Sequence, residues 1–202
     1  MNLYKFHSEP EALDHHKLTH DTVPDFFWNN SKEMSTIARN KFLKTKIQYI
    51  TKSAKYSFLY ARDILKSSFP EGEKAIAANA AFSLGYATII RKPFPLGEKI
   101  IATKAYESYW YAKDVLKGPF KLGEPIIATD IKLAFDYAAN VLKGPFKLGE
   151  PAIASDPNTS FKYAKEVLRG QFLEGEKAIK NSSSEQGYLK FLKSKKISIA
   201  DW

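Results

Sequence analysis

The chain has 202 residues, of which 44% are hydrophobic and none is cysteine, and its formal net charge is +9. This composition is typical of an ordered protein, and it excludes a disulfide framework and a thiolate metal site. No run of about 18 apolar residues is present, so no membrane-spanning helix is expected. The basic charge favours a nucleic acid, an anionic lipid or an acidic protein surface as the partner.

Residues 1–30 are predicted to form a separate leader. They carry 2 basic and 5 acidic side chains, a net charge of −3, whereas residues 31–202 carry 29 basic and 17 acidic side chains, a net charge of +12. Pro10 and Pro24 bracket a candidate short helix over residues 11–20, and no apolar segment typical of a secretory signal is present. The aromatic stretch at residues 25–28 is expected to dock on the repeats that follow.

A repeated pattern dominates the rest of the chain. Residues 31–52 are predicted to be a degenerate N-terminal capping repeat, and residues 53–181 to be five tandem repeats of about 26 residues. The dipeptide Tyr-Ala begins at Tyr60, Tyr86, Tyr111, Tyr137 and Tyr163. The dipeptide Gly-Glu begins at Gly72, Gly97, Gly123, Gly149 and Gly175. One residue is missing between Tyr86 and Glu98. A fixed step of this length indicates a stacked repeat architecture.

Each repeat is predicted to contain a longer helix, a tight loop and a short helix. In the repeat over residues 130–155, Asp130 is the expected N-cap, and apolar residues at helical spacing run to Leu142. Gly144 is the expected left-handed residue that ends the helix. Phe146 is expected to fill the space between neighbouring repeats, and Pro151 to open the short helix.

The predicted fold is therefore all-α: a short α-solenoid, a right-handed α–α superhelix of helix–loop–short-helix repeats. One repeat is too small to bury a sufficient core alone, so each must pack on its neighbours. Small residues at the centre of each long helix allow close approach of adjacent helices; they are Ala61, Ala87, Ala112, Ala138 and Ala164. Residues 182–202 are predicted to be a C-terminal capping helix that is basic and amphipathic.

The pattern Y-A-x-x-V-L-K-G-x-F-x-x-G-E-x-x-I-A resembles a family of 26-residue tandem-repeat proteins of tailed bacteriophages and related viral sequences. The opening residues 1–28 resemble the leader that often precedes such repeats. The resemblance implies a viral protein that acts in the cytoplasm of a bacterial host, and the lack of cysteine fits a reducing compartment. The resemblance implies no assigned activity and no functional residues.

A column of cations is the main candidate binding feature. It comprises Lys66, Lys92 (or Arg91, given the missing residue), Lys117, Lys143 and Arg169. Stacked cations can follow a phosphate backbone or an acidic protein, although cations at helix ends also complement the helix dipole. A weaker second column comprises Arg62, Lys113 and Lys165.

Two further columns have structural and functional interpretations. The glutamates after each repeated glycine could form acid–base pairs or a metal row, but an acid present in every repeat more simply caps its short helix or pairs with a lysine. The repeated tyrosines could stack on nucleobases, but their spacing also fits packing at the flank of the core, with each hydroxyl at the rim.

The remaining candidates are unique to one position. All four histidines lie in the first 20 residues, and His16 and His20 are one helical turn apart, but no third ligand or His-Glu-x-x-His motif completes a zinc site. Five residues at one phase differ freely between repeats and mark a candidate recognition surface; they are Leu59, Gly85, Trp110, Asp136 and Lys162.

No catalytic motif is present, so we expect a non-enzymatic binding scaffold without a cofactor or metal. The expected partner is a protein, with the cation column and Trp110 as candidate contacts. A nucleic-acid-binding protein that uses the cation column is the alternative. The histidine cluster is the one feature of the sequence that could support a metal-dependent activity.

Overall fold

The computed structural model describes residues 28–198, and every regular element in that range is a helix, as predicted for an all-α fold. The chain divides into two compact units, Met1–Ile76 and Ala77–Trp202.

The first unit holds two long-and-short helical pairs. Its helices are α2 (Thr36–Thr45), α3 (Ile47–Ile50), α4 (Ala54–Leu59), η1 (Tyr60–Leu65), η2 (Pro70–Gly72) and α5 (Glu73–Ile76). Trp28 is buried; its ring lies 5.6 Å from that of Tyr56, and the Arg39 guanidinium lies 4.9 Å from the Trp28 ring centroid. The histidines, the candidate helix over residues 11–20 and residues 25–27 lie outside the described residues.

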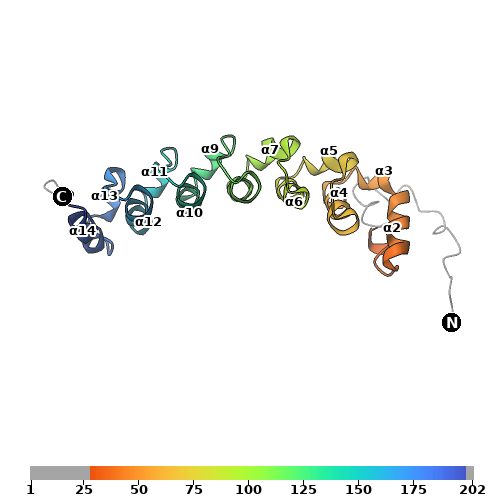
Figure 1. Ribbon diagram of the computed structural model, residues 1–202, viewed down its shortest axis with the longest axis horizontal. Coiled ribbons are helices and arrows are strands. Elements are labelled where there is room, and N and C mark those ends of the chain that lie inside the picture. The colour runs from red at the N-terminus through yellow and green to blue at the C-terminus, as the bar shows by residue number, and fades with distance from the viewer. Residues whose placement is uncertain (1–27, 199–202) are drawn as a thin grey trace. The chain divides into compact units, whose positions relative to one another are not determined.

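The second unit continues the alternation of long and short helices (Figure 1). Its helices are α6 (Ala80–Ile90), α7 (Pro95–Ile101), α8 (Ala105–Trp110), η3 (Tyr111–Leu116), α9 (Glu124–Ile127), α10 (Ile131–Tyr137), η4 (Ala138–Leu142), α11 (Glu150–Ile153), α12 (Pro157–Lys162), η5 (Tyr163–Leu168), α13 (Leu173–Ile179) and α14 (Glu185–Ser194). Each long helix packs on the short helix that follows it and on the next long helix, and the short helices line one side of the unit.

The predicted helix starts are confirmed. The Asp130 carboxylate accepts a hydrogen bond from the Leu133 amide at 2.8 Å, and the Asp156 carboxylate accepts one from the Thr159 amide at 2.7 Å. Pro151 and Pro157 stand in the first turns of α11 and α12, where a missing amide hydrogen removes no helical bond.

The repeated small residues form the places where helices approach most closely. All five repeated alanines are fully buried, as predicted. At Gly149 a Cβ atom would lie 2.5 Å from the Phe146 ring and 2.8 Å from the Ala134 Cβ atom. Glycine is therefore required where the start of the short helix crosses both the loop phenylalanine and the long helix.

The predicted loop phenylalanines are buried, and each ring packs on the tyrosine of its own repeat. Phe146 is 3% exposed, and its ring centroid lies 5.0 Å from that of Tyr137. The same 5.0 Å contact joins Tyr111 to Phe120 and Tyr163 to Phe172. The phenyl ring thus fills the interior of its own repeat. The backbone amide of the same phenylalanine, and not the ring, forms the hydrogen bond to the next repeat.

The end of the long helix differs from the prediction. Lys143, not Gly144, is the left-handed residue, with φ of 52°, and no described glycine has a positive φ. The helix changes from α to π geometry over η4, and the amides of Lys143 and Gly144 both donate to the Ala138 carbonyl. The chain reverses at the residue before the glycine, so a lysine must adopt the conformation that favours glycine.

This geometry explains the one missing residue in the second repeat. In the third repeat the amide of the left-handed Lys117 donates to Ala112, five residues back, across the π-helical η3. In the second repeat α6 stays α-helical to Ile90, and the amide of the left-handed Arg91 donates to Ala87, four residues back. A π turn contains one extra residue, so its loss converts π to α geometry and leaves the loop unchanged.

Candidate functional site

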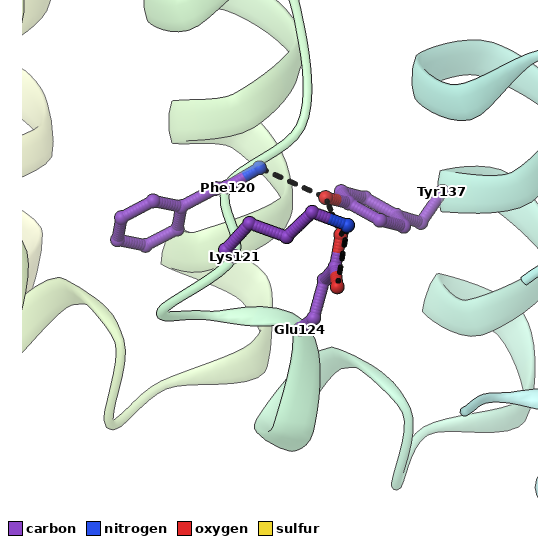
Figure 2. Close-up of polar contacts among 4 residues, drawn as sticks. All are labelled: Phe120, Lys121, Glu124 and Tyr137. Atoms are coloured by element: carbon purple, nitrogen blue, oxygen red, sulfur yellow. Dashed lines mark hydrogen bonds and ion pairs between the residues drawn. The ribbon is translucent and has the colours of Figure 1, made fainter.

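Within the second unit, a buried tyrosine hydroxyl joins neighbouring repeats, and Figure 2 shows the link made by Tyr137. The Tyr137 hydroxyl accepts a hydrogen bond from the Phe120 amide at 2.9 Å and donates one to Glu124 Oε1 at 3.0 Å. Lys121 Nζ lies 3.0 Å from the same carboxylate oxygen. One side chain thereby satisfies the loop amide of the preceding repeat and fixes the first residue of its short helix.

The same link recurs with nearly constant geometry. The Tyr111, Tyr163 and Tyr188 hydroxyls accept from the Phe94, Phe146 and Phe172 amides at 2.8, 2.8 and 3.0 Å. They donate to Glu98, Glu150 and Glu176 at 2.8, 2.9 and 3.0 Å. Tyr188 belongs to α14, so the predicted C-terminal capping helix provides the last copy of the link.

These contacts settle the interpretation of the tyrosine column. Tyr111, Tyr137, Tyr163 and Tyr188 are fully buried, and burial raises the pKa of each hydroxyl well above its ordinary value of 10.0. The rings are enclosed and cannot stack on a nucleobase. The prediction that the repeated tyrosines pack against the core is confirmed, but their hydroxyls lie buried between repeats and not at the rim of the core.

The acidic column is likewise part of the fold. Glu150 is 3% exposed, stands in the first turn of α11, accepts the Tyr163 hydroxyl and pairs with Lys147 Nζ at 2.8 Å. Its position at the helix start is as predicted, but no side chain caps the first turn of α11. A lysine partner is present at Glu124 and Glu150, whereas Glu176 accepts a hydrogen bond from Gln171. The tyrosine partner was not foreseen, because its constant separation of 13 residues from Glu98, Glu124 and Glu150 follows from the repeat period and does not by itself indicate a contact.

The cation column is exposed, and one of its predicted members is replaced by a neighbouring residue. Its members by position are Lys66, Arg91, Lys117, Lys143 and Arg169, all with φ of 52° to 54°. Lys92, the predicted member, is the next residue along; it occupies the place that Gly118 and Gly144 hold in other repeats, because the missing residue lies upstream of Arg91. None of these cations has a carboxylate partner among residues 28–198.

An exposed leucine accompanies each cation of the second unit and was missed by the sequence reasoning. Leu96, Leu122, Leu148 and Leu173 are 59%, 52%, 53% and 67% exposed. Each follows its cation by four or five residues in the same connection between long and short helix. The signal was the leucine of the F-x-L-G-E segment in three repeats; in the fourth the segment reads F-L-E-G-E, so Leu173 stands one position earlier and Glu174 takes the leucine's place.

Trp110 lies in an aromatic cluster that the other repeats lack. Its ring centroid is 5.2 Å from that of Tyr109 and 6.0 Å from that of Tyr106, which is 60% exposed. The Lys113 ammonium lies 4.6 Å from the Trp110 ring centroid and 5.6 Å from that of Tyr109. Trp110 Nε1 is shielded from solvent without a hydrogen-bond acceptor.

The other divergent positions do not share one environment. Leu59, Gly85 and Asp136 are half-buried like Trp110, whereas Lys162 is fully exposed. Their shared phase therefore does not by itself define a uniform exposed surface.

Within residues 28–198, no group of three or more His, Cys, Asp or Glu side chains is arranged to hold a metal ion. Over the same range, no helix is both long and apolar enough to cross a bilayer.

Comparison with protein-family models, with curated proteins and with solved structures found no match. The resemblance to viral tandem-repeat proteins therefore stays a prediction from the repeat pattern.

Proposed function

We propose that this chain is a non-enzymatic scaffold that binds a protein partner, and that it is a viral protein acting in the cytoplasm of its host. The viral assignment and the compartment rest on the repeat pattern alone. The binding role is supported by where each repeated side chain of the second unit lies, inside the fold or on its surface. Repeat proteins stack small units into extended surfaces, and those surfaces commonly bind other macromolecules.

The observation that carries the proposal is that some repeated side chains are bonded inside the fold, whereas others are exposed to solvent. The tyrosines and glutamates, which could have supported chemistry, bond to each other and to the Phe amides across repeat boundaries. The cations and leucines at the loop are exposed in every repeat of the second unit and lie outside its interior. The cations complement the helix ends, but that role does not require the exposed leucines of the same loops, and the recurrence of both favours a shared external contact.

A nucleic-acid partner is the second candidate, because the four column cations of the second unit have no carboxylate partner among the described residues. Two features favour a protein instead. The aromatic column that would stack on bases is buried, and the side chains beside the cations are aliphatic. Leucine contributes buried apolar area to a protein interface but has no aromatic face for a base.

The test is purification of the full chain from its native host cell with nuclease treatment, followed by mass spectrometry of the retained proteins. We expect a stoichiometric protein that survives the nuclease, and a sample whose absorbance ratio shows no nucleic acid. Separately, the purified chain is titrated with DNA and RNA at low and high salt. The nucleic-acid candidate would be supported instead by two results together. The logarithm of the association constant for DNA or RNA would fall linearly with the logarithm of the salt concentration, and nuclease would release all retained protein.

A further inference from the structure

We infer that the loop edge of the second unit is the docking surface, and that its partner is an acidic protein segment with one apolar side chain per repeat. The loop edge is defined by two sets of residues. Its cations are Arg91, Lys117, Lys143 and Arg169, and its leucines are Leu96, Leu122, Leu148 and Leu173. This inference rests on the proposed function and names the surface and the partner.

The charge of the loop edge calls for an acidic partner. Residues 77–202 contain 19 basic and 13 acidic side chains, and four of the acids accept a tyrosine hydroxyl inside the fold. Lys121 and Lys147, which also lie in these loops, are neutralised by Glu124 and Glu150. The loop-edge cations are not neutralised, so a partner that carries carboxylates at this edge gains attraction without displacing an existing ion pair.

The backbone holds each loop-edge cation in one conformation. Lys117 has φ of 53°, and the amides of Lys117 and Gly118 both donate to the Ala112 carbonyl. Lys143 and Ala138 repeat that arrangement. Binding therefore needs to order only the cationic side chains, because the backbone that carries them is already fixed.

The leucines supply the apolar part of the interface. Each is more than half exposed, whereas the isoleucine that ends the short helix is fully buried, as Leu96 and Ile101 of α7 illustrate. A repeated apolar side chain that faces solvent while its neighbour fills the core is typical of an unoccupied contact surface. A highly charged partner without apolar groups would leave these leucines exposed, so we exclude a purely electrostatic one.

The repeat spacing sets the spacing in the partner. Successive long helices of the second unit pack on each other, and packed helices lie about 8–10 Å apart. A polypeptide in the polyproline II conformation advances about 3.1 Å per residue with three residues per turn, so one repeat corresponds to about three residues and every third side chain faces the same way. A segment of about ten residues, with an apolar side chain at every third position and acidic residues between, spans the four repeats.

The experiment is selection of a displayed random 12-residue peptide library on the full chain, followed by affinity measurement of the enriched peptides. Two double variants each remove one kind of side chain from the loop edge. Leu122→Ser with Leu148→Ser removes apolar area, and Lys117→Asn with Lys143→Asn removes charge while keeping a residue that tolerates the left-handed conformation. Matched controls are Ile37→Ser, which is 83% exposed in the first unit, and Lys132→Gln, which is exposed on α10.

We expect the enriched peptides to be acidic, with apolar residues at three-residue spacing, and to bind each edge variant at least about tenfold more weakly. We expect both control variants to bind as the parent does, and thermal melts to show that all variants fold. Peptides that lack net negative charge, or that bind the edge variants unchanged, overturn this inference and leave the scaffold proposal standing. An unenriched library also overturns it, and together with salt-dependent binding of DNA or RNA it overturns both.

Discussion

Removal of one linking hydroxyl gives a direct measure of the contact that joins the repeats. In the Tyr163→Phe variant the ring stays in place, but the Phe146 amide loses its acceptor at 2.8 Å and Glu150 loses its donor at 2.9 Å. Both groups are shielded, since Phe146 and Glu150 are each 3% exposed. Water therefore cannot readily replace the lost oxygen.

The magnitude follows from those two losses. A buried amide without a partner costs about 1–3 kcal/mol, and a hydrogen bond to a charged group contributes about 1.5–3 kcal/mol. Glu150 keeps Lys147 at 2.8 Å, which offsets part of the second loss. We expect the free energy of unfolding to fall by about 3 kcal/mol, which in a chain of this length lowers the melting temperature by about 6–12 °C.

The assay is urea unfolding followed by circular dichroism, combined with amide hydrogen exchange at Phe146. We expect a lower midpoint and faster exchange at that amide. The control is Tyr106→Phe, because Tyr106 is 60% exposed and its hydroxyl makes no hydrogen bond among the described residues; its stability should match the parent. Parental stability in Tyr163→Phe, with unchanged exchange at Phe146, would refute the claim that this hydroxyl joins the repeats.

Four other perturbations test the same packing. Above pH 10 the unfolded tyrosines lose protons that the folded ones retain, so stability should fall as pH rises in a pH-dependent thermal melt, and less steeply in Tyr163→Phe than in the parent. Ala138→Leu should lower the free energy of unfolding by about 1–3 kcal/mol through overpacking, and a melt equal to the parent would contradict its burial. Gly149→Ala should cost a similar amount, whereas Gly144→Ala, whose new Cβ meets only a carbonyl at 3.9 Å, should be neutral or slightly stabilising by chemical denaturation. Deletion of Ala139 should leave a folded repeat with an α-helical end like that of α6, whereas deletion of Phe135, which shifts the apolar stripe, should unfold it; equal circular dichroism spectra for the two deletions would be the contrary result.

Much of the fold could be predicted because its signals are local. The caps at Asp130 and Asp156 depend on a carboxylate within three residues of an unpaired amide, and such contacts are set by chain geometry. The fixed 26-residue step required every repeat to bury the same positions, so Ala138 and Phe146 could be placed in the interior without coordinates. The candidate cations could be found because they recur at one phase.

The tertiary structure decided what each recurring residue does. Tyr137 meets Glu124 and the Phe120 amide only because adjacent repeats pack together, and no local pattern distinguishes that hydroxyl from one at a solvent rim. The chain reverses at Lys143 and not at Gly144, and Arg91 reverses it in the same way after α6, which stays α-helical, so neither the glycine nor the local helix type fixes that position. Sequence by itself therefore determined which positions repeat, because periodicity is written along the chain. Only packing determined which of these side chains are buried between repeats and which stay exposed, where a partner could bind them.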